Sequence, residues 1–280
     1  MLAELTMELE ADSAEFGYYQ SSNLQGILME QIDTGYAGRL HEQGRKPYSQ
    51  HLAGGKVKQW SVSTLTEEAY QNIILPLLDG QFREFDIEKK QMHVNICKKE
   101  LKTLSYQELM NEFYEKPCSR HISMEIVTPA SFKSHGRYIN FPDMHYIYQS
   151  LMNKYSAVSE GMDMYDEETL GQLAEATSIV QYQLRSAAFF LEGVKIPSFL
   201  GKMCIRVNGT ETMARYARLL MRFGDYSGIG IKTAIGMGGM KQYDGCMDRS
   251  RDGITGRSRG ADRSSSYRKH AEAYTGCTAP

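Results

Sequence analysis

The sequence predicts an α+β protein built from two units that follow one another along the chain. In the first unit, residues 2–10 alternate between apolar and polar side chains, which is typical of a half-buried strand. A helical pattern over 24–32 follows, and a second helix begins near residue 66 after a strand-like segment. In the second unit the order restarts with an alternating strand at 121–127. Strand, helix, strands, helix, strand is the order of a ferredoxin-like unit, so we expect two in tandem.

The first unit contains further segments with clear local signals. Residues 56–64 predict a strand, and the helix that opens at Thr66 is expected to end at Asp79-Gly80. Strand-like stretches lie around 82–85 and 93–99. A short segment bounded by Gly35 and Gly44 separates the first helix from the next strand, and it is rich in polar and charged side chains.

Turn residues and periodicity predict the second unit. Glycine follows a polar residue at two points, His135-Gly136 and Glu192-Gly193, and each pair is expected to turn a hairpin. The expected elements are a hairpin at 132–139, a helix that begins at 142–143, paired strands at 179–191 and 194–207, and a helix at 210–223 that Gly224 ends.

The chain divides into three parts. We place the boundary between the two α+β units near residues 116–119, which gives domains at 1–119 and 120–243. Residues 244–280 are rich in Gly, Ser, Arg and Asp and contain almost no aliphatic side chains. Such a segment cannot bury enough apolar surface to fold, so we expect a disordered tail that can at most tether RNA weakly.

Composition excludes several classes of protein. Hydrophobic residues make up 41% of the 280 residues, and the net charge is −2, so any phosphate contacts must come from local basic clusters. No apolar run is long enough to span a bilayer, and the acidic, alternating first residues do not resemble a signal peptide. The five cysteines are scattered without a CxxC pair, and an odd number argues against a disulfide framework. We therefore expect a cytoplasmic protein.

The sequence carries no signature of a metal or cofactor site. No two histidines stand at HxxxH spacing with a glutamate between them, as a zinc helix requires. The acidic residues at Asp163 and 166–168 are interpreted as a solvated loop and a helix start. We expect no metal and no cofactor.

Six glycines lie within the sixteen residues 224–239. A phosphate-binding P-loop needs adjacent Gly-Lys-Thr, whereas Ile231 separates Gly230 from Lys232. A dinucleotide fingerprint would follow a strand, and this segment follows a predicted helix. Three interpretations stay open: amides packed on an RNA backbone, amides packed on the neighbouring domain, and a flexible connector.

Three stretches together resemble one family. The segment GDYSGIGIKTAIGMGGMK is similar to the glycine-rich loop of the CRISPR-associated repeat-RNA endoribonucleases of the RAMP superfamily. NLQGILMEQI and GRLHEQGRKPYSQHL resemble the family's first helix and its histidine segment, and TPASFKSHGRYINFPDMHYIYQSLMNKY resembles the opening of its second domain. The resemblance covers residues 1–243 in order. It implies two ferredoxin-like domains, CRISPR repeat RNA as partner and substrate, and no membrane; an interference complex and a homodimer stay open as further partners.

The implied reaction is RNA cleavage without a metal. The 2′-hydroxyl of the substrate attacks phosphorus, so the enzyme must remove its proton, protonate the departing 5′-oxygen and stabilise the charge, which yields a 2′,3′-cyclic phosphate and a 5′-hydroxyl. Histidine suits either proton transfer because its ordinary pKa of about 6.5 lies near working pH. A lysine can supply preorganised positive charge. Carried over from the family, these roles fall on His41 and Lys46.

A third catalytic group is less directly indicated. Some members of the family have a tyrosine near the end of the first helix, where this chain has Met29. We expect Tyr36 to replace it from the following segment, or the third group to be dispensable. His51 competes with His41 for the main role because it lies beside Lys56 in the sequence.

Basic and aromatic side chains are expected to hold the RNA. A hairpin can present cations to phosphates and an aromatic ring to a base, and a glycine-rich loop can approach a backbone closely. The three arginines between 215 and 222 are instead interpreted as the solvated face of a helix. The RNA-binding candidates are Arg39, Arg45, Lys56, Lys58, Lys133, Arg137, Tyr138, Gly228, Gly230 and Lys232.

Two other functions remain as alternatives. A non-catalytic RAMP-type subunit that holds guide RNA in a CRISPR effector complex would share the folds and the glycine loop without needing His41. A nucleotide-dependent enzyme would use residues 224–233 as a phosphate loop. Ile231 argues against this alternative, because it separates Gly230 from Lys232. Cleavage of repeat RNA in EDTA and a nucleotide-binding assay separate these alternatives from the nuclease.

Overall fold

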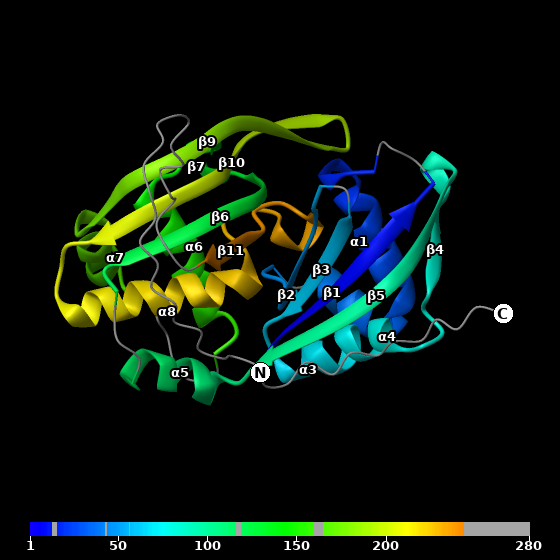
Figure 1. The fold of residues 1–280 in the computed structure, drawn as a ribbon, viewed down its shortest axis with the longest axis horizontal. Helices are drawn as coiled ribbons and strands as arrows, with labels where there is room; N and C mark the ends of the chain where they lie inside the picture. The colour runs from blue at the N-terminus through cyan, green and yellow to red at the C-terminus, as the bar shows by residue number, and fades with distance from the viewer. Residues whose placement is uncertain (13–15, 43, 56, 116–118, 160–164, 244–280) are drawn as a thin grey trace, which may run out of the picture.

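The structure, a computed structural model, describes residues 1–12, 16–42, 44–55, 57–115, 119–159 and 165–243. Lys56 and the predicted tail at 244–280 lie outside the described residues. Two antiparallel sheets lie side by side along the long axis of the molecule (Figure 1). No helix among the described residues is long and apolar enough to cross a membrane.

The first sheet has five strands in the order β2-β3-β1-β5-β4. Its central strand β1 pairs with β3 on one side and β5 on the other, both antiparallel. Without β4, this is the arrangement of a ferredoxin-like unit. The elements are β1 (Leu2–Ala11), α1 (Ser21–Gln31), α2 (Thr34–Glu42), β2 (Tyr48–Ala53), β3 (Lys58–Thr64), α3 (Glu67–Ala69), a π-helical turn (Tyr70–Ile74), α4 (Leu75–Leu78), β4 (Glu84–Ile87) and β5 (Met92–Leu104).

The second sheet has four strands in the order β11-β6-β10-β9, the same topology as the first without its extra strand. The tandem ferredoxin-like prediction is therefore confirmed. Its elements are β6 (His121–Ala130), α6 (Met144–Ser156), α7 (Glu167–Glu175), β9 (Thr177–Leu191), β10 (Val194–Val207), α8 (Glu211–Ser227) and β11 (Met240–Tyr243), and a small hairpin, β7 (Phe132–Ser134) with β8 (Arg137–Ile139), follows β6.

Each sheet has its own apolar core, and the alternating strands explain where each core lies. Leu5 and Met7 of β1 are fully buried on one face of the sheet. Glu8, the next residue after Met7, points to the other face. Met124 of β6 is buried in the same way against α6 and α8. Helix α5 (Tyr106–Glu115) packs on α8 and contributes Leu109 to the second core, so its packing groups it with the second unit. The predicted boundary near 116–119 stays a prediction.

Several elements differ from the sequence-based expectation, which includes neither α5 nor β11. The glycine-bounded segment forms helix α2, and β2 precedes the predicted strand at 56–64. Helix α8 does not end at Gly224 but continues to Ser227, and Gly228, at φ +61°, follows it. Gly224 therefore lies inside the helix, where a Cβ atom would lie 2.8 Å from the sulfur of Met240. The glycine allows close packing on β11 and does not form a turn.

The end of α8 and the glycine-rich segment lie between the two sheets, where Figure 1 shows them in orange. A Cβ atom at Gly236 would lie 2.1 Å from Cβ of Ser21, which belongs to α1. One at Gly239 would lie 2.7 Å from the imidazole of His51 in β2. The segment therefore packs tightly on the first domain and joins the two units.

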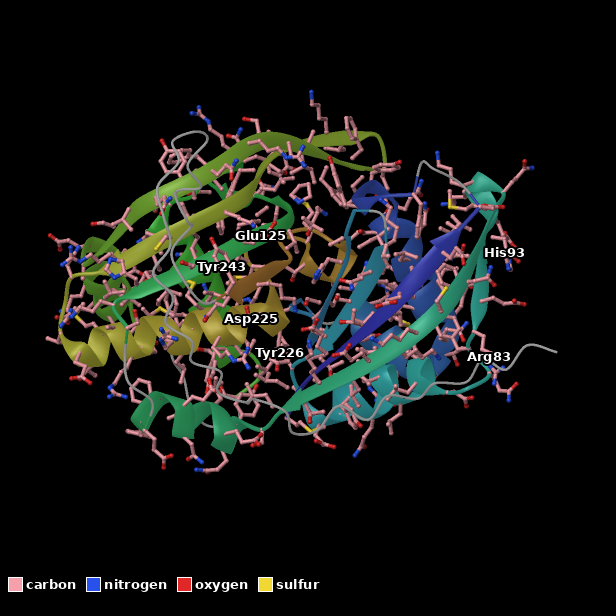
Figure 2. All side chains as sticks on the ribbon, viewed as in Figure 1. Arg83, His93, Glu125, Asp225, Tyr226 and Tyr243 are labelled. Carbon is pink, nitrogen blue, oxygen red and sulfur yellow. The ribbon has the colours of Figure 1, made fainter. Side chains whose placement is uncertain are left out.

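A buried group of charges reinforces this junction. Lys241 of β11 forms an ion pair with Glu4 of β1 and donates to the carbonyl of Asp225 at 3.1 Å. The Asp225 carboxylate accepts from Arg222 at 2.9 Å and from the amide of Gln242 at 2.6 Å. Burial raises the pKa of Asp225 against the pull of Lys241. Burial also acts to raise the pKa of Glu4, but Lys241, His51 and Thr6 together outweigh it and hold that pKa below its ordinary value. The labelled Asp225 and Tyr226 lie in the middle of the molecule (Figure 2).

Candidate active site

His41 lies exposed in the last turn of α2. The helix begins after Asp33, whose carboxylate accepts from the amide of Tyr36 at 2.9 Å and so satisfies one of the free amides of the first turn. Tyr36 and Leu40 are buried on the core side of α2, which leaves His41, one residue further round the helix, on the solvent side. The imidazole is thus accessible to a substrate, as the prediction requires.

Lys46 follows α2 in the chain, and its side chain reaches back to the end of that helix. Its ammonium donates to the carbonyl of Leu40 and lies 3.4 Å from the carbonyl of His41. The last carbonyls of a helix carry partial negative charge, so a cation there stabilises the helix end. Lys46 therefore contacts the main chain of the helical turn that presents His41, and it holds that turn in place.

Tyr36 is poorly placed to act as the third catalytic group. The side chain is 2% exposed, and its hydroxyl has no hydrogen-bond partner among the described residues. Burial, helped by the charge of Glu68, raises the pKa of Tyr36 to about 12. Its ring is covered by Arg39, whose guanidinium lies 5.2 Å from the ring centroid. In this conformation the hydroxyl cannot reach a substrate, which favours the alternative that the third group is dispensable.

The predicted RNA-binding cations of the first domain lie in different environments. Arg39 forms an exposed ion pair with Glu68 at 3.0 Å, a contact weak enough to yield to a phosphate. Lys58 is half-buried at the start of β3. Arg45 reaches across to the second domain, where its guanidinium donates to the main-chain and side-chain oxygens of Asn153, each at 3.2 Å.

The hairpin β7–β8 carries the candidates of the second domain. Lys133 and Arg137 are exposed, and the ammonium of Lys133 lies 5.9 Å from the ring centroid of Tyr138. Tyr138 is half-buried and packs on a small cluster that includes Met237 of the glycine-rich segment. Lys232 is exposed in that segment with φ +57°. The hairpin and the glycine-rich segment therefore form one surface, which carries three cations.

The glycine-rich segment does not present its amides to solvent. Gly228 donates to the Gly224 carbonyl at 2.9 Å, and Gly230 donates to the Ser150 hydroxyl at 2.9 Å. These hydrogen bonds argue against the prediction that Gly228 and Gly230 contact an RNA backbone, because both amides donate within the second domain. The glycines of this segment that pack on the first domain are Gly236 and Gly239. The same hydrogen bonds argue against a nucleotide-phosphate loop. The amides of Gly228, Ile229, Gly230, Ile231, Gly238 and Gly239 all donate to acceptors within the protein.

His51, the competitor of His41, is buried between the domains. It is 5% exposed, and Gly239 packs directly on its ring. Burial, together with the charge of Lys241 and against the opposing charge of Glu4, lowers the pKa of His51 to about 4. A neutral, enclosed imidazole cannot exchange protons with an RNA substrate, so the structure favours His41. The exposed His93 lies at the far edge of the first domain, paired with Asp86 at 2.8 Å (Figure 2).

The buried His51 predicts a pH-dependent stability. Between pH 6.5 and 4 the unfolded chain binds a proton at this position that the folded chain does not, so acidification favours unfolding. We expect the His51→Gln variant to lose up to about 3 kcal/mol of this pH dependence. Chemical denaturation at pH 7 and pH 4.5 measures it, with His121→Gln, an exposed position, as the control. If the unfolding free energy of His51→Gln fell between pH 7 and pH 4.5 as much as that of the wild type, the buried, neutral state of His51 would be contradicted.

The site also contains residues that the sequence did not indicate. Lys154 of α6 donates to the carbonyls of Ser227 and Gly228, at 3.2 and 2.9 Å. Burial, together with the charge of Arg45, lowers the pKa of Lys154 to about 7. Ser49 of β2 donates to the Tyr226 carbonyl at 2.5 Å. None of these residues stands out by type or spacing, because each acts on a main-chain oxygen that is distant in sequence.

Comparisons with known proteins decide the family. A curated CRISPR-associated endoribonuclease Cas6 from Streptococcus thermophilus is 36% identical over 217 residues, which cover 77% of this chain and 88% of that protein. The chain belongs to the Cas6 family. The Cas6 endoribonuclease of Mycobacterium tuberculosis is 31% identical over 249 residues, covering 86% of this chain and 78% of that protein. The family model for the CRISPR-associated endoribonuclease Cas6 matches residues 124–240. The predicted family is confirmed.

Solved structures of Cas6 proteins share the fold. A Cas6 product complex superposes with a TM-score of 0.70 at 22% identity, covering 87% of this chain and 99% of that chain. Thermus thermophilus Cas6 superposes with a TM-score of 0.64 at 21% identity, covering 87% and 98%. The two-sheet architecture of this chain is therefore the one found in solved Cas6 structures.

Proposed function

We propose that this chain cleaves CRISPR repeat RNA without a metal ion and releases guide RNAs. The proposal rests on membership of the Cas6 endoribonuclease family. It rests above all on the exposed imidazole of His41, at the end of a helix whose last turn the ammonium of Lys46 contacts. The substrate's 2′-oxygen forms a bond to phosphorus, and the bond to the 5′-oxygen breaks. The 2′-hydroxyl proton leaves to a base, and a proton is given to the departing 5′-oxygen.

His41 takes part as a general acid or base, and Lys46 supplies positive charge near the phosphate. Cations on both domains hold the RNA backbone: the exposed Arg39 and the half-buried Lys58 on the first, and the exposed Lys133, Arg137 and Lys232 on the second. Since RNA is the substrate, the proposal places the chain in the cytoplasm, where transcripts are made.

Cleavage of the cognate repeat tests the proposal. We expect equal rates in EDTA and in magnesium, a 2′,3′-cyclic phosphate on the upstream product, and no cut when the nucleotide before the scissile bond carries a 2′-deoxy sugar. Tight binding without cleavage would instead indicate a non-catalytic subunit. Cleavage that stops in EDTA and returns with magnesium would contradict the metal-independent mechanism.

A further inference from the structure

The chain from the end of α2 into β2 contacts the second domain at two points. Between the two elements, the guanidinium of Arg45 donates to both oxygens of Asn153 in α6, each at 3.2 Å. In β2, the hydroxyl of Ser49 donates to the carbonyl of Tyr226 in α8 at 2.5 Å. Lys46 lies between these two anchors, and its ammonium reaches back to the helix end that carries His41. The position of the catalytic pair therefore depends on the second domain.

The two contacts reach neighbouring parts of the second domain. Lys154 follows Asn153 in α6, and its ammonium donates to the carbonyls of Ser227, the last residue of α8, and of Gly228, next to the carbonyl that Ser49 contacts. A planar guanidinium with two donors to one residue fixes both distance and orientation, which a single contact does not. Helix α6, which Lys154 joins to the end of α8, thus offers Arg45 a pair of acceptors.

We propose that Arg45 and Asn153 form an interdomain latch that positions His41 and Lys46 for cleavage. The inference rests on the proposed function. In it Arg45 is a positioning residue and not a phosphate ligand, although sequence alone places it among the RNA-binding cations. Misplacing a catalytic group by about 1 Å can cost about 100-fold in rate, so an exposed contact of little value to stability can matter greatly to catalysis.

Single-turnover cleavage at saturating RNA, together with RNA affinity at several salt concentrations, tests the latch. We expect Arg45→Ala to lower the cleavage rate by about 10- to 100-fold without changing affinity or its salt dependence. Asn153→Ala should lower the rate less, because the main-chain acceptor remains. The double variant should equal Arg45→Ala, since both substitutions break the same contact. Asn153→Asp keeps an acceptor oxygen and should restore the rate.

Arg83→Ala is the matched control, because Arg83 lies at the far edge of the first domain, where its side chain donates to the nearby Gly80 carbonyl (Figure 2). Weakened affinity and a salt dependence reduced by about one phosphate contact in Arg45→Ala would make Arg45 an RNA ligand and overturn the latch. Additive losses in the double variant, or an unchanged rate in Arg45→Ala, would overturn it as well. Wild-type protein that binds but does not cut would refute the proposed function instead.

Discussion

The His41→Ala variant is expected to cleave repeat RNA about 1,000-fold more slowly than the wild type, because a positioned general acid or base typically contributes 100- to 10,000-fold. The side chain is exposed at the end of α2, and the described contacts of this turn involve its carbonyl and not its ring. Folding and RNA affinity should therefore be nearly unchanged. Single-turnover cleavage, thermal unfolding and RNA binding measure the three quantities.

His121→Ala provides the matched control, since His121 is also exposed but lies at the start of β6 in the other domain. It should cleave at the wild-type rate. If His41→Ala cut normally, the assignment of the site would be wrong, while the proposed function would stand. A loss of affinity equal to the loss of rate would instead make His41 an RNA-binding residue.

The Gly238→Ala variant is expected to lose about 3 kcal/mol or more of folding stability. Gly238 has φ +66°, and a Cβ atom there would lie 1.9 Å from the Ile229 carbonyl oxygen. Left-handed strain and overpacking each cost about 1–3 kcal/mol. The neighbouring carbonyl cannot move aside freely, because it lies in the segment whose amide at Ile229 donates to Gly238 at 2.8 Å.

Gly171→Ala is the matched control for this substitution. Gly171 lies in α7, where an added Cβ meets nothing within 4 Å, and alanine favours helix, so its stability should stay equal or rise by up to about 1 kcal/mol. Chemical denaturation of both variants measures the difference. A Gly238→Ala protein of wild-type stability with weakened RNA binding would contradict the packing role and restore the prediction that these amides contact RNA.

These two predictions concern residues that sequence alone treats alike, as parts of family motifs. The structure separates them by what surrounds each one. His41 is exposed to a substrate, whereas Gly236 and Gly239 pack against α1 and β2 of the first domain. The other glycines of the segment, Gly228, Gly230 and Gly238, pack against atoms of the second domain. A loss of activity in a glycine variant is therefore expected to follow from a displaced site and not from a lost RNA contact.

Local patterns predicted much of the fold. Alternation in β1 and β6, and the turns at 135–136 and 192–193, are properties of neighbouring residues, and the structure contains the corresponding strands and hairpins. Helix α2 was missed because its glycines and polar residues weaken the helical pattern, which the capping contact of Asp33 and the burial of Leu40 compensate. The end of α8 was misplaced because Gly224 resembles a cap, while the space beside Met240 decides its role.

In the candidate site, too, some features follow from local sequence and others only from the tertiary structure. Sequence alone indicated the fold class, the family and the pair His41 and Lys46, because chemical type, spacing and resemblance are all written in neighbouring residues. Only the tertiary structure decided that His51 and the Tyr36 hydroxyl are enclosed, that the glycine amides are already bonded, and that Arg45 meets Asn153. Burial and hydrogen bonding depend on which distant segments pack together, and no local pattern records that.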